Sequence, residues 1–358
     1  MKRALIVLLL LAVAAGGLFA QLTISGNVQS GLEVVIPNEG DTTFNWRTTD
    51  AGMTYRFHLG ASYTNEAGTV GASGALRNNA GSPAIDGGNA WVKLLDKQLH
   101  LQIGNGAPGG FGSQGNFGEG HNAADANFNA VFAPAGTNFS VGLGISPAGD
   151  IFTKATYGFG LKVGVPNVLT AVANANFVPD TEVANAAAGV SISALNAPSG
   201  ETGISSLGVD VVAKNVTDLK WIGIGPQVGF RIAGVGADNL NLGLRSRIFL
   251  PLDDSVELDY WVGLDVGVNL TPNVGLNING GYEANANART NGDLGSPNGE
   301  GTGREIGGSG NAGFIVRPQL DFNLGGGAHI ITGWSLQAVM ADEMFLQNAI
   351  YARLAVSF

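Results

Sequence analysis

Few residues of this chain occur at spacings that would support catalysis or cofactor binding. The glycines of residues 104–109 follow the pattern G-x-G-x-x-G, which holds a dinucleotide when a helix follows it. Residues 110–115 are again rich in glycine, so a helix is unfavourable there. In a chain with 56 glycines among 358 residues this spacing arises by chance. We therefore expect no nucleotide cofactor.

Metal and acid–base chemistry have equally little support. The four histidines show no HExxH or paired spacing, and the chain has no cysteine, so a zinc site is not expected. No serine, histidine and carboxylate form a recognisable group along the sequence. The Asn- and Gly-rich residues around Asp293 lack the ordered ligand spacing of a calcium loop. We expect no enzyme activity, no metal and no cofactor.

A different functional signal comes from charged side chains, which occur at alternate positions of apolar segments. In residues 256–270, apolar side chains alternate with Glu257, Asp259, Trp261 and Asp265. A period of two residues indicates a β-strand with two different faces. A carboxylate that faced lipid would cost a few kcal/mol, so these carboxylates should face water. The pattern predicts an apolar outer face and a wet interior.

Similar segments recur from residue 22 to residue 358. They predict an all-β fold, namely a transmembrane antiparallel β-barrel of about 16–18 strands. The number is 18 if residues 165–215 include one further hairpin and 16 if they do not. Most segments are longer than the roughly 5–6 residues of soluble strands and suit a tilted bilayer crossing. The last segment alternates up to Phe358. It should pair with residues 22–34 and close the barrel, because an unpaired edge invites aggregation.

The lengths of the connections alternate along the chain. Long links are expected at residues 36–52, 78–88, 105–126, 178–186 and 285–312, whereas most links between them are tight turns, with 196–204 as an exception. Long external loops and short periplasmic turns are typical of outer-membrane barrels. A soluble β-sandwich has no reason to separate its loops by length in this way.

Composition and the N-terminus restrict the location and partners of the chain. Lys2 and Arg3 precede an apolar run and small residues, which predicts a signal peptide over residues 1–20, with a membrane anchor as the weaker alternative. The formal net charge of −10 argues against nucleic-acid binding. Only 13% of residues are charged, which suits a protein surrounded by lipid. We therefore expect the mature chain, residues 21–358, to lie in the lipid of an outer membrane.

Two stretches resemble known outer-membrane proteins. Residues 350–358, ending in Phe358, are similar to the insertion signal of bacterial outer-membrane barrels. The order of segments and turns over residues 89–145 resembles the middle of general diffusion porins. That resemblance implies that loop 105–126 folds into the barrel and presents carboxylates opposite a basic wall, and that the protein is a homotrimer. The loop offers Glu119, His121 and Asp125, a thinner acidic set than the family shows.

Alternation also identifies cations that should face the interior. Together with the three loop residues they are the candidate pore-lining or constriction residues. They are Arg56, Arg231, Arg245, Arg247, Arg317 and Arg353, accompanied by Lys154 and Lys162. Opposed charges across a narrow wet gap would orient polar solutes and slow apolar ones. Alternatively, these charges only solvate the interior.

The sequence therefore favours an outer-membrane porin of a Gram-negative-type bacterium. It would let small hydrophilic solutes and ions diffuse passively through a water-filled barrel. The first alternative is a surface adhesin or structural barrel protein that displays its external loops. The second is a secreted soluble β-rich binding protein.

Overall fold

The computed structural model describes residues 21–38, 40–46, 55–79, 82–104, 111, 128–146, 155–213, 215–254, 258–284, 312–340 and 344–358. The predicted signal peptide lies outside these residues, as does all of loop 105–126 except Phe111. Both therefore stay predictions.

The described chain is almost entirely β-strand. The strands are β1 (Gln21–Pro37), β2 (Thr43–Trp46), β3 (Tyr55–Thr64), β4 (Val70–Asn79), β5 (Ser82–Leu94), β6 (Leu99–Gly104), β7 (Phe128–Phe132), β8 (Phe139–Ser146), β9 (Thr156–Val165), β10 (Leu169–Val178), β11 (Val183–Ile192), β12 (Gly203–Ala213), β13 (Trp221–Ala233), β14 (Asn239–Pro251), β15 (Asp259–Thr271), β16 (Val274–Glu283), β17 (Ala312–Gly325), β18 (Ala328–Met340) and β19 (Met344–Ser357). Two short 3-10 turns, η1 (Pro179–Thr181) and η2 (Val216–Asp218), lie between strands. Among the described residues, no helix has the length and apolar character needed to cross a bilayer.

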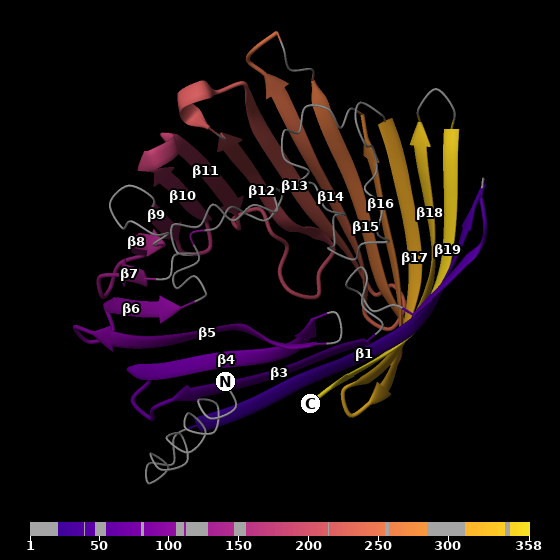
Figure 1. The fold of residues 1–358 in the computed structure, drawn as a ribbon, viewed down its shortest axis with the longest axis horizontal. Coiled ribbons are helices and arrows are strands. Elements are labelled where there is room, and N and C mark those ends of the chain that lie inside the picture. Colours follow the sequence, from indigo (N-terminus) through magenta and orange to yellow (C-terminus); the bar gives the residue numbers. More distant parts are fainter. Residues whose placement is uncertain are drawn as a thin grey trace.

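The two ends of the sheet meet and close it into a ring (Figure 1). β19 pairs antiparallel with β1, with Val28 opposite Val356 and Val34 opposite Ile350. The last residue takes part in this closure. The N–H of Phe358 donates to the carbonyl of Gly26 at 3.0 Å, and the N–H of Gly26 donates back to the carbonyl of Phe358 at 2.8 Å. The predicted pairing of the first and last strands is confirmed.

β2 and β3 share one edge of β1. β1 pairs with β3 through its first residues and with β2 further along, so the two short pieces occupy one position in the ring. The barrel therefore has 18 strand positions, the upper end of the predicted range. No hairpin is lost between residues 165 and 215, where β10 to β12 pair in sequence order.

The prediction of a long loop is wrong for three of the links. Residues 36–52 contain β2, residues 78–88 belong mostly to β4 and β5, and β11 begins at Val183 directly after η1. All three segments contain Pro, Asp, Asn and Ala, which have weak intrinsic strand preference. Pairing with neighbouring strands overrides that preference, because every strand of a closed barrel has two partners.

Two prolines inside strands do not shift the register. Pro226 lies in β13 and Pro318 in β17, and the β13–β14 and β17–β18 ladders each skip the proline and resume in the same register. Proline lacks a backbone N–H, so each costs a ladder bond without moving the strand.

Side chains alternate between the two surfaces of the barrel. On β15, Asp259 is 0% exposed and Trp261 is buried, whereas Leu264 is 49% exposed and Val262 is also exposed. The exposed side chains face outward, where lipid would surround them, and the buried ones face the interior. The predicted separation of apolar and charged faces is confirmed in the strands that the structure describes.

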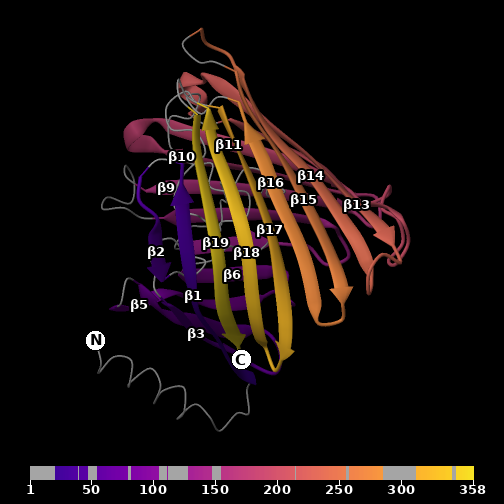
Figure 2. The ribbon, with the colours of Figure 1, turned by 90° about the vertical axis from the view of Figure 1, so that its right-hand side faces the viewer.

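The two ends of the barrel differ. Figure 2 shows the turns between β15 and β16 and between β17 and β18 at the same end as Phe358. These turns contain only two residues each, 272–273 and 326–327. The connections at the opposite end include 105–127 and 284–311, which are much longer. The short turns mark the periplasmic end and the long connections the external end.

Candidate functional site: the inner wall of the barrel

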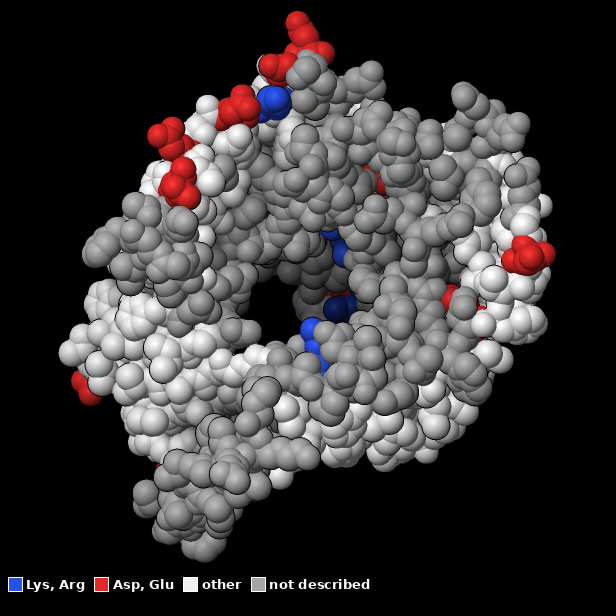
Figure 3. Space-filling model, in the orientation of Figure 1, with Lys and Arg blue, Asp and Glu red and all other residues white. Residues whose placement is uncertain are grey.

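The inward face carries a ring of buried polar and charged side chains. They are Glu33, Gln102, Asn129, Asn174, Asp210, Arg247, Asp259, Glu283, Arg317, Ser335, Gln337 and Gln347. A barrel of this size is too wide for its side chains to fill. Figure 3 looks into the ring and shows an open passage, with basic side chains at its edge and many acidic ones on the rim.

The structure places six predicted cations on the inward faces of their strands. Arg245 and Arg247 lie on β14, and Lys162 lies on β9, two residues beyond the inward Gly160. The other three are Arg231 on β13, Arg317 on β17 and Arg353 on β19. Arg56 is in β3, but its side chain is outside the described part, as are Glu119, His121 and Asp125. A constriction between these two sets stays a prediction.

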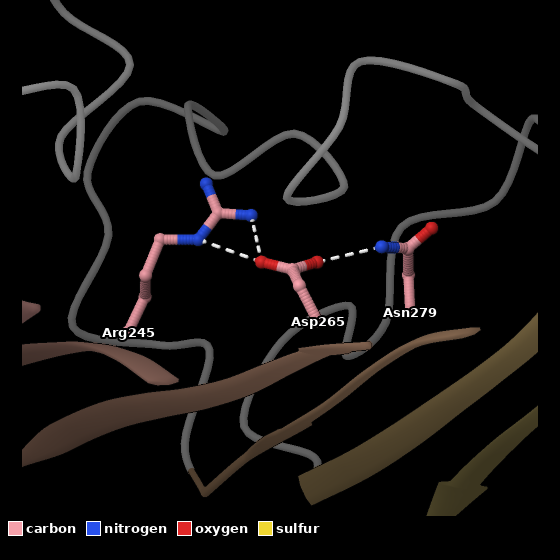
Figure 4. A network of polar contacts seen from close by, with 3 residues as sticks. All are labelled: Arg245, Asp265 and Asn279. Carbon is pink, nitrogen blue, oxygen red and sulfur yellow. Dashed lines mark hydrogen bonds and ion pairs between the residues drawn. The ribbon is translucent and has the colours of Figure 1, made fainter. Parts of the chain in front are cut away.

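One polar network joins three neighbouring strands (Figure 4). Arg245 Nε donates to Asp265 Oδ2 at 2.9 Å, and Arg245 Nη2 contacts the same oxygen. Asn279 Nδ2 donates to Asp265 Oδ1 at 2.6 Å. The side chains of Arg245 and Asp265 are 26% and 27% exposed, so both can still meet a solute in the lumen. On the next strand, β17, Arg317 is paired with Asn279 and so continues the line of polar side chains across the wall.

An aromatic side chain covers the wall beside this network. The Trp261 ring lies across the inward positions of Gly263 and Gly281, where a Cβ would come within 2.0 Å and 2.7 Å of it. Arg247 stacks over the same ring at 5.4 Å from the guanidinium carbon to the centroid. Any larger residue at the two glycines would push the ring into the lumen. Sequence reasoning placed Trp261 inward but missed the glycines that let it lie flat.

A contrasting sector of wall lies on β7 to β10, where Lys162 of β9 is the one charged side chain on the described inward face. Phe111 is completely buried there, packed on Val131 of β7. Gly142 of β8 and Gly160 of β9 lie under its ring, and Asn174 Nδ2 of β10 donates to its backbone carbonyl at 2.7 Å. Sequence reasoning missed this cluster. Its only signal was a pair of inward glycines on adjacent strands.

Two smaller groups lie near the periplasmic turns. Trp91 contacts His100 edge-on at 5.5 Å between ring centroids, and Lys93 Nζ lies 5.0 Å from the Trp91 ring centroid. On the β17–β18 hairpin, His329 Nδ1 lies 2.9 Å from Asp321 Oδ1. Over the described ranges, no three potential metal-ligating side chains gather as a cation site would require.

Comparison with known proteins gives a likeness in fold. No family model matches the chain, and no curated protein matches it. The outer membrane protein OprD from Pseudomonas aeruginosa aligns over 94% of both chains, with a TM-score of 0.58 and 9% identity. OpdL of the same organism aligns over 94% of this chain and 99% of its own, with a TM-score of 0.59 and 10% identity.

A third similar structure was solved with a small molecule. It is OpdK of Pseudomonas aeruginosa with vanillate, which aligns over 94% of this chain and 99% of its own, with a TM-score of 0.55 and 12% identity. At these identities the likeness shows the fold alone. The chain has the closed antiparallel barrel of outer-membrane porins, and its apolar outer face suits an outer membrane.

Proposed function

We propose that this chain is a pore through which small hydrophilic solutes and ions diffuse across an outer membrane, without chemistry of its own. The observation that carries this proposal is the sorting of side chains around the closed ring. Arginines and carboxylates occupy the inward face, whereas leucine, valine and phenylalanine occupy the outward face. Charged side chains inside a closed barrel require water, and a barrel filled with water conducts.

The inner wall further supports a pore that orients its solutes. The charged network on β14 to β17 stands across the ring from the sector on β7 to β10, where Lys162 is the one charged side chain on the described inward face (Figure 1). A polar solute between them meets several fixed charges on one side and a single cation on the other. This asymmetry would turn the dipole of a solute and slow apolar molecules, which gain nothing from the charges.

The partly exposed Arg245 suggests which solutes to test first. A guanidinium binds carboxylates through paired N–H groups, and the OpdK structure contains vanillate, an aromatic carboxylate. We propose small carboxylates as the first class, beside sugars as an uncharged reference. Uptake of both into protein-containing liposomes at equal rates would mean that size alone selects.

Export and assembly are further parts of the proposal. The predicted signal peptide over residues 1–20 would be removed, leaving residue 21 at the mature N-terminus; N-terminal sequencing of the membrane protein tests this. The homotrimer implied by the resemblance to general porins is tested by the mass of the detergent-solubilised protein, corrected for bound detergent.

Planar-bilayer recording tests the pore itself. We expect purified protein to give discrete, stable current steps, and a salt gradient would then give the sign of its ion preference. A folded protein that inserts but conducts at no applied voltage would refute the pore and favour the adhesin or structural barrel. Heat-modifiable gel mobility, measured on the same sample, ensures that the protein is folded.

A further inference from the structure

The strongest unexplained feature of the molecule is the burial of Phe111. The residue lies in the connection between Gly104, the end of β6, and Phe128, the start of β7. Such connections run over the rim of a barrel and are usually exposed. Phe111 is instead 0% exposed and lies on the inward face of the wall.

The wall has a recess of matching shape at this point. Gly142 and Gly160 are opposite each other in the β8–β9 ladder, near the middle of both strands. A Cβ at Gly142 would lie 2.4 Å from Phe111 Cε2, and one at Gly160 would lie 2.6 Å from Phe111 Cγ. Both distances are shorter than real carbon contacts, so the ring fits only because both positions are glycine.

Neighbouring strands hold the rest of the residue. Val131 packs against the ring from β7, and the Asn174 amide of β10 donates to the backbone carbonyl of Phe111 at 2.7 Å. Asn174 is itself buried, and a buried polar contact of this kind fixes orientation as well as position. Four adjacent strands therefore contribute to one binding site for one residue of a connection.

We propose that Phe111 is a positioning residue that tethers the connection between β6 and β7 to the inner wall. The inference rests on the proposed pore and deepens it, because it places one residue of this connection on the wall of the lumen. Phe111 itself lies against the middle of β8 and β9. The tether lies on the β7–β10 sector, across the ring from Arg245 and Asp265.

The equilibrium should strongly favour the state in which Phe111 is bound to the wall. Replacing a buried phenylalanine by alanine removes contacts that, in other cores, shift an equilibrium by about a hundredfold or more. We expect Phe111→Ala to release the connection by a factor of this order while the barrel ladder stays intact. We expect the loss of this contact to raise the noise of the open-channel current.

A disulfide trap tests the contact directly, because the chain has no native cysteine. The Phe111→Cys/Gly160→Cys pair places two thiols where Cβ atoms lie 2.9 Å apart, so a small shift reaches disulfide geometry. The matched control is Phe111→Cys/Gly164→Cys. Gly164 lies on the same strand and face but about 13 Å further along it. Free thiols are counted by maleimide mass tagging of the folded protein after mild oxidation.

We expect the 111/160 pair to lose nearly all of its free thiols and the 111/164 pair to keep them. Equal oxidation of the two pairs would overturn the tether. A second readout avoids cysteine. Gly160→Ala should increase the open-channel current noise severalfold, whereas Gly164→Ala, whose Cβ finds only ordinary contacts at 3.6 Å, should leave it unchanged. Unchanged noise in both alanine variants would also overturn the tether.

The two proposals fail differently. A wild-type channel that conducts, together with no selective 111/160 disulfide, refutes the tether and leaves the pore. A selective disulfide in a folded barrel that never conducts refutes the pore and leaves the tether as a structural contact.

Discussion

Asp265→Asn should make the pore more selective for anions. The carboxylate holds Arg245 and Asn279 in one network and is 27% exposed to the lumen. Asparagine keeps the size of the side chain and an oxygen that can accept from Arg245, so the charge is the main change. Arg245 would then act on passing ions without a neighbouring negative charge.

The magnitude follows from Coulomb's law. A monovalent ion that passes about 5 Å from the lost charge changes in energy by about 0.8 kcal/mol at the dielectric constant of water. That energy corresponds to about a fourfold change in local ion concentration. Salt screens the effect, since the Debye length falls from about 10 Å at 0.1 M to about 3 Å at 1 M.

The assay is the reversal potential across a bilayer under a salt gradient. We expect Asp265→Asn to move it toward the anion equilibrium potential at about 0.1 M salt and much less near 1 M. The matched control is Asp218→Asn, whose side chain is 69% exposed beside Lys220, outside the barrel wall. An unchanged reversal potential for Asp265→Asn, or an equal shift in the control, would refute the placement of Asp265 along the ion path.

Three further changes test the wall and its closure. Leu264→Arg puts a charge on the lipid face and should lower the free energy of unfolding by about 2–4 kcal/mol near mid-membrane, measured by urea titration in lipid vesicles; no loss would contradict the outward orientation. Phe358→Ser should reduce the amount of assembled barrel in the outer membrane, and unchanged surface levels would count against the terminal signal. Gly263→Ala should displace the Trp261 ring and cost about 1–3 kcal/mol in the same urea assay. Gly243→Ala, which meets only ordinary contacts, serves as its control and should cost less.

Much of the fold could be predicted because alternation is local. Asp259 beside Tyr260 already separates an inward from an outward face, and the apolar residues before Phe358 already demand a partner strand. The strand residues within 78–88 and 178–186 could not be predicted, because Pro, Asp, Asn and Ala, which occur in both segments, have weak strand preference and pair only when neighbouring strands impose the ladder.

The site was less predictable than the fold. Alternation indicates that Arg245 and Asp265 face inward, but their contact depends on the register between β14 and β15, which places Asp265 opposite Gly243. The buried position of Phe111 depends on Gly142 of β8 and Gly160 of β9. The sequence shows these two residues only as glycines. The recess above them exists only once the strands of the wall have packed together.

The most direct test of the account compares two adjacent cysteines in a chain that has none of its own. Asp265→Cys and Leu264→Cys sit side by side on β15, the first facing the lumen and the second, 49% exposed, facing outward. A charged, membrane-impermeant thiol reagent added during single-channel recording should reduce the current of Asp265→Cys within seconds to minutes and leave Leu264→Cys unchanged. Equal block of both variants, or block of Leu264→Cys alone, would contradict a barrel with water inside and lipid outside.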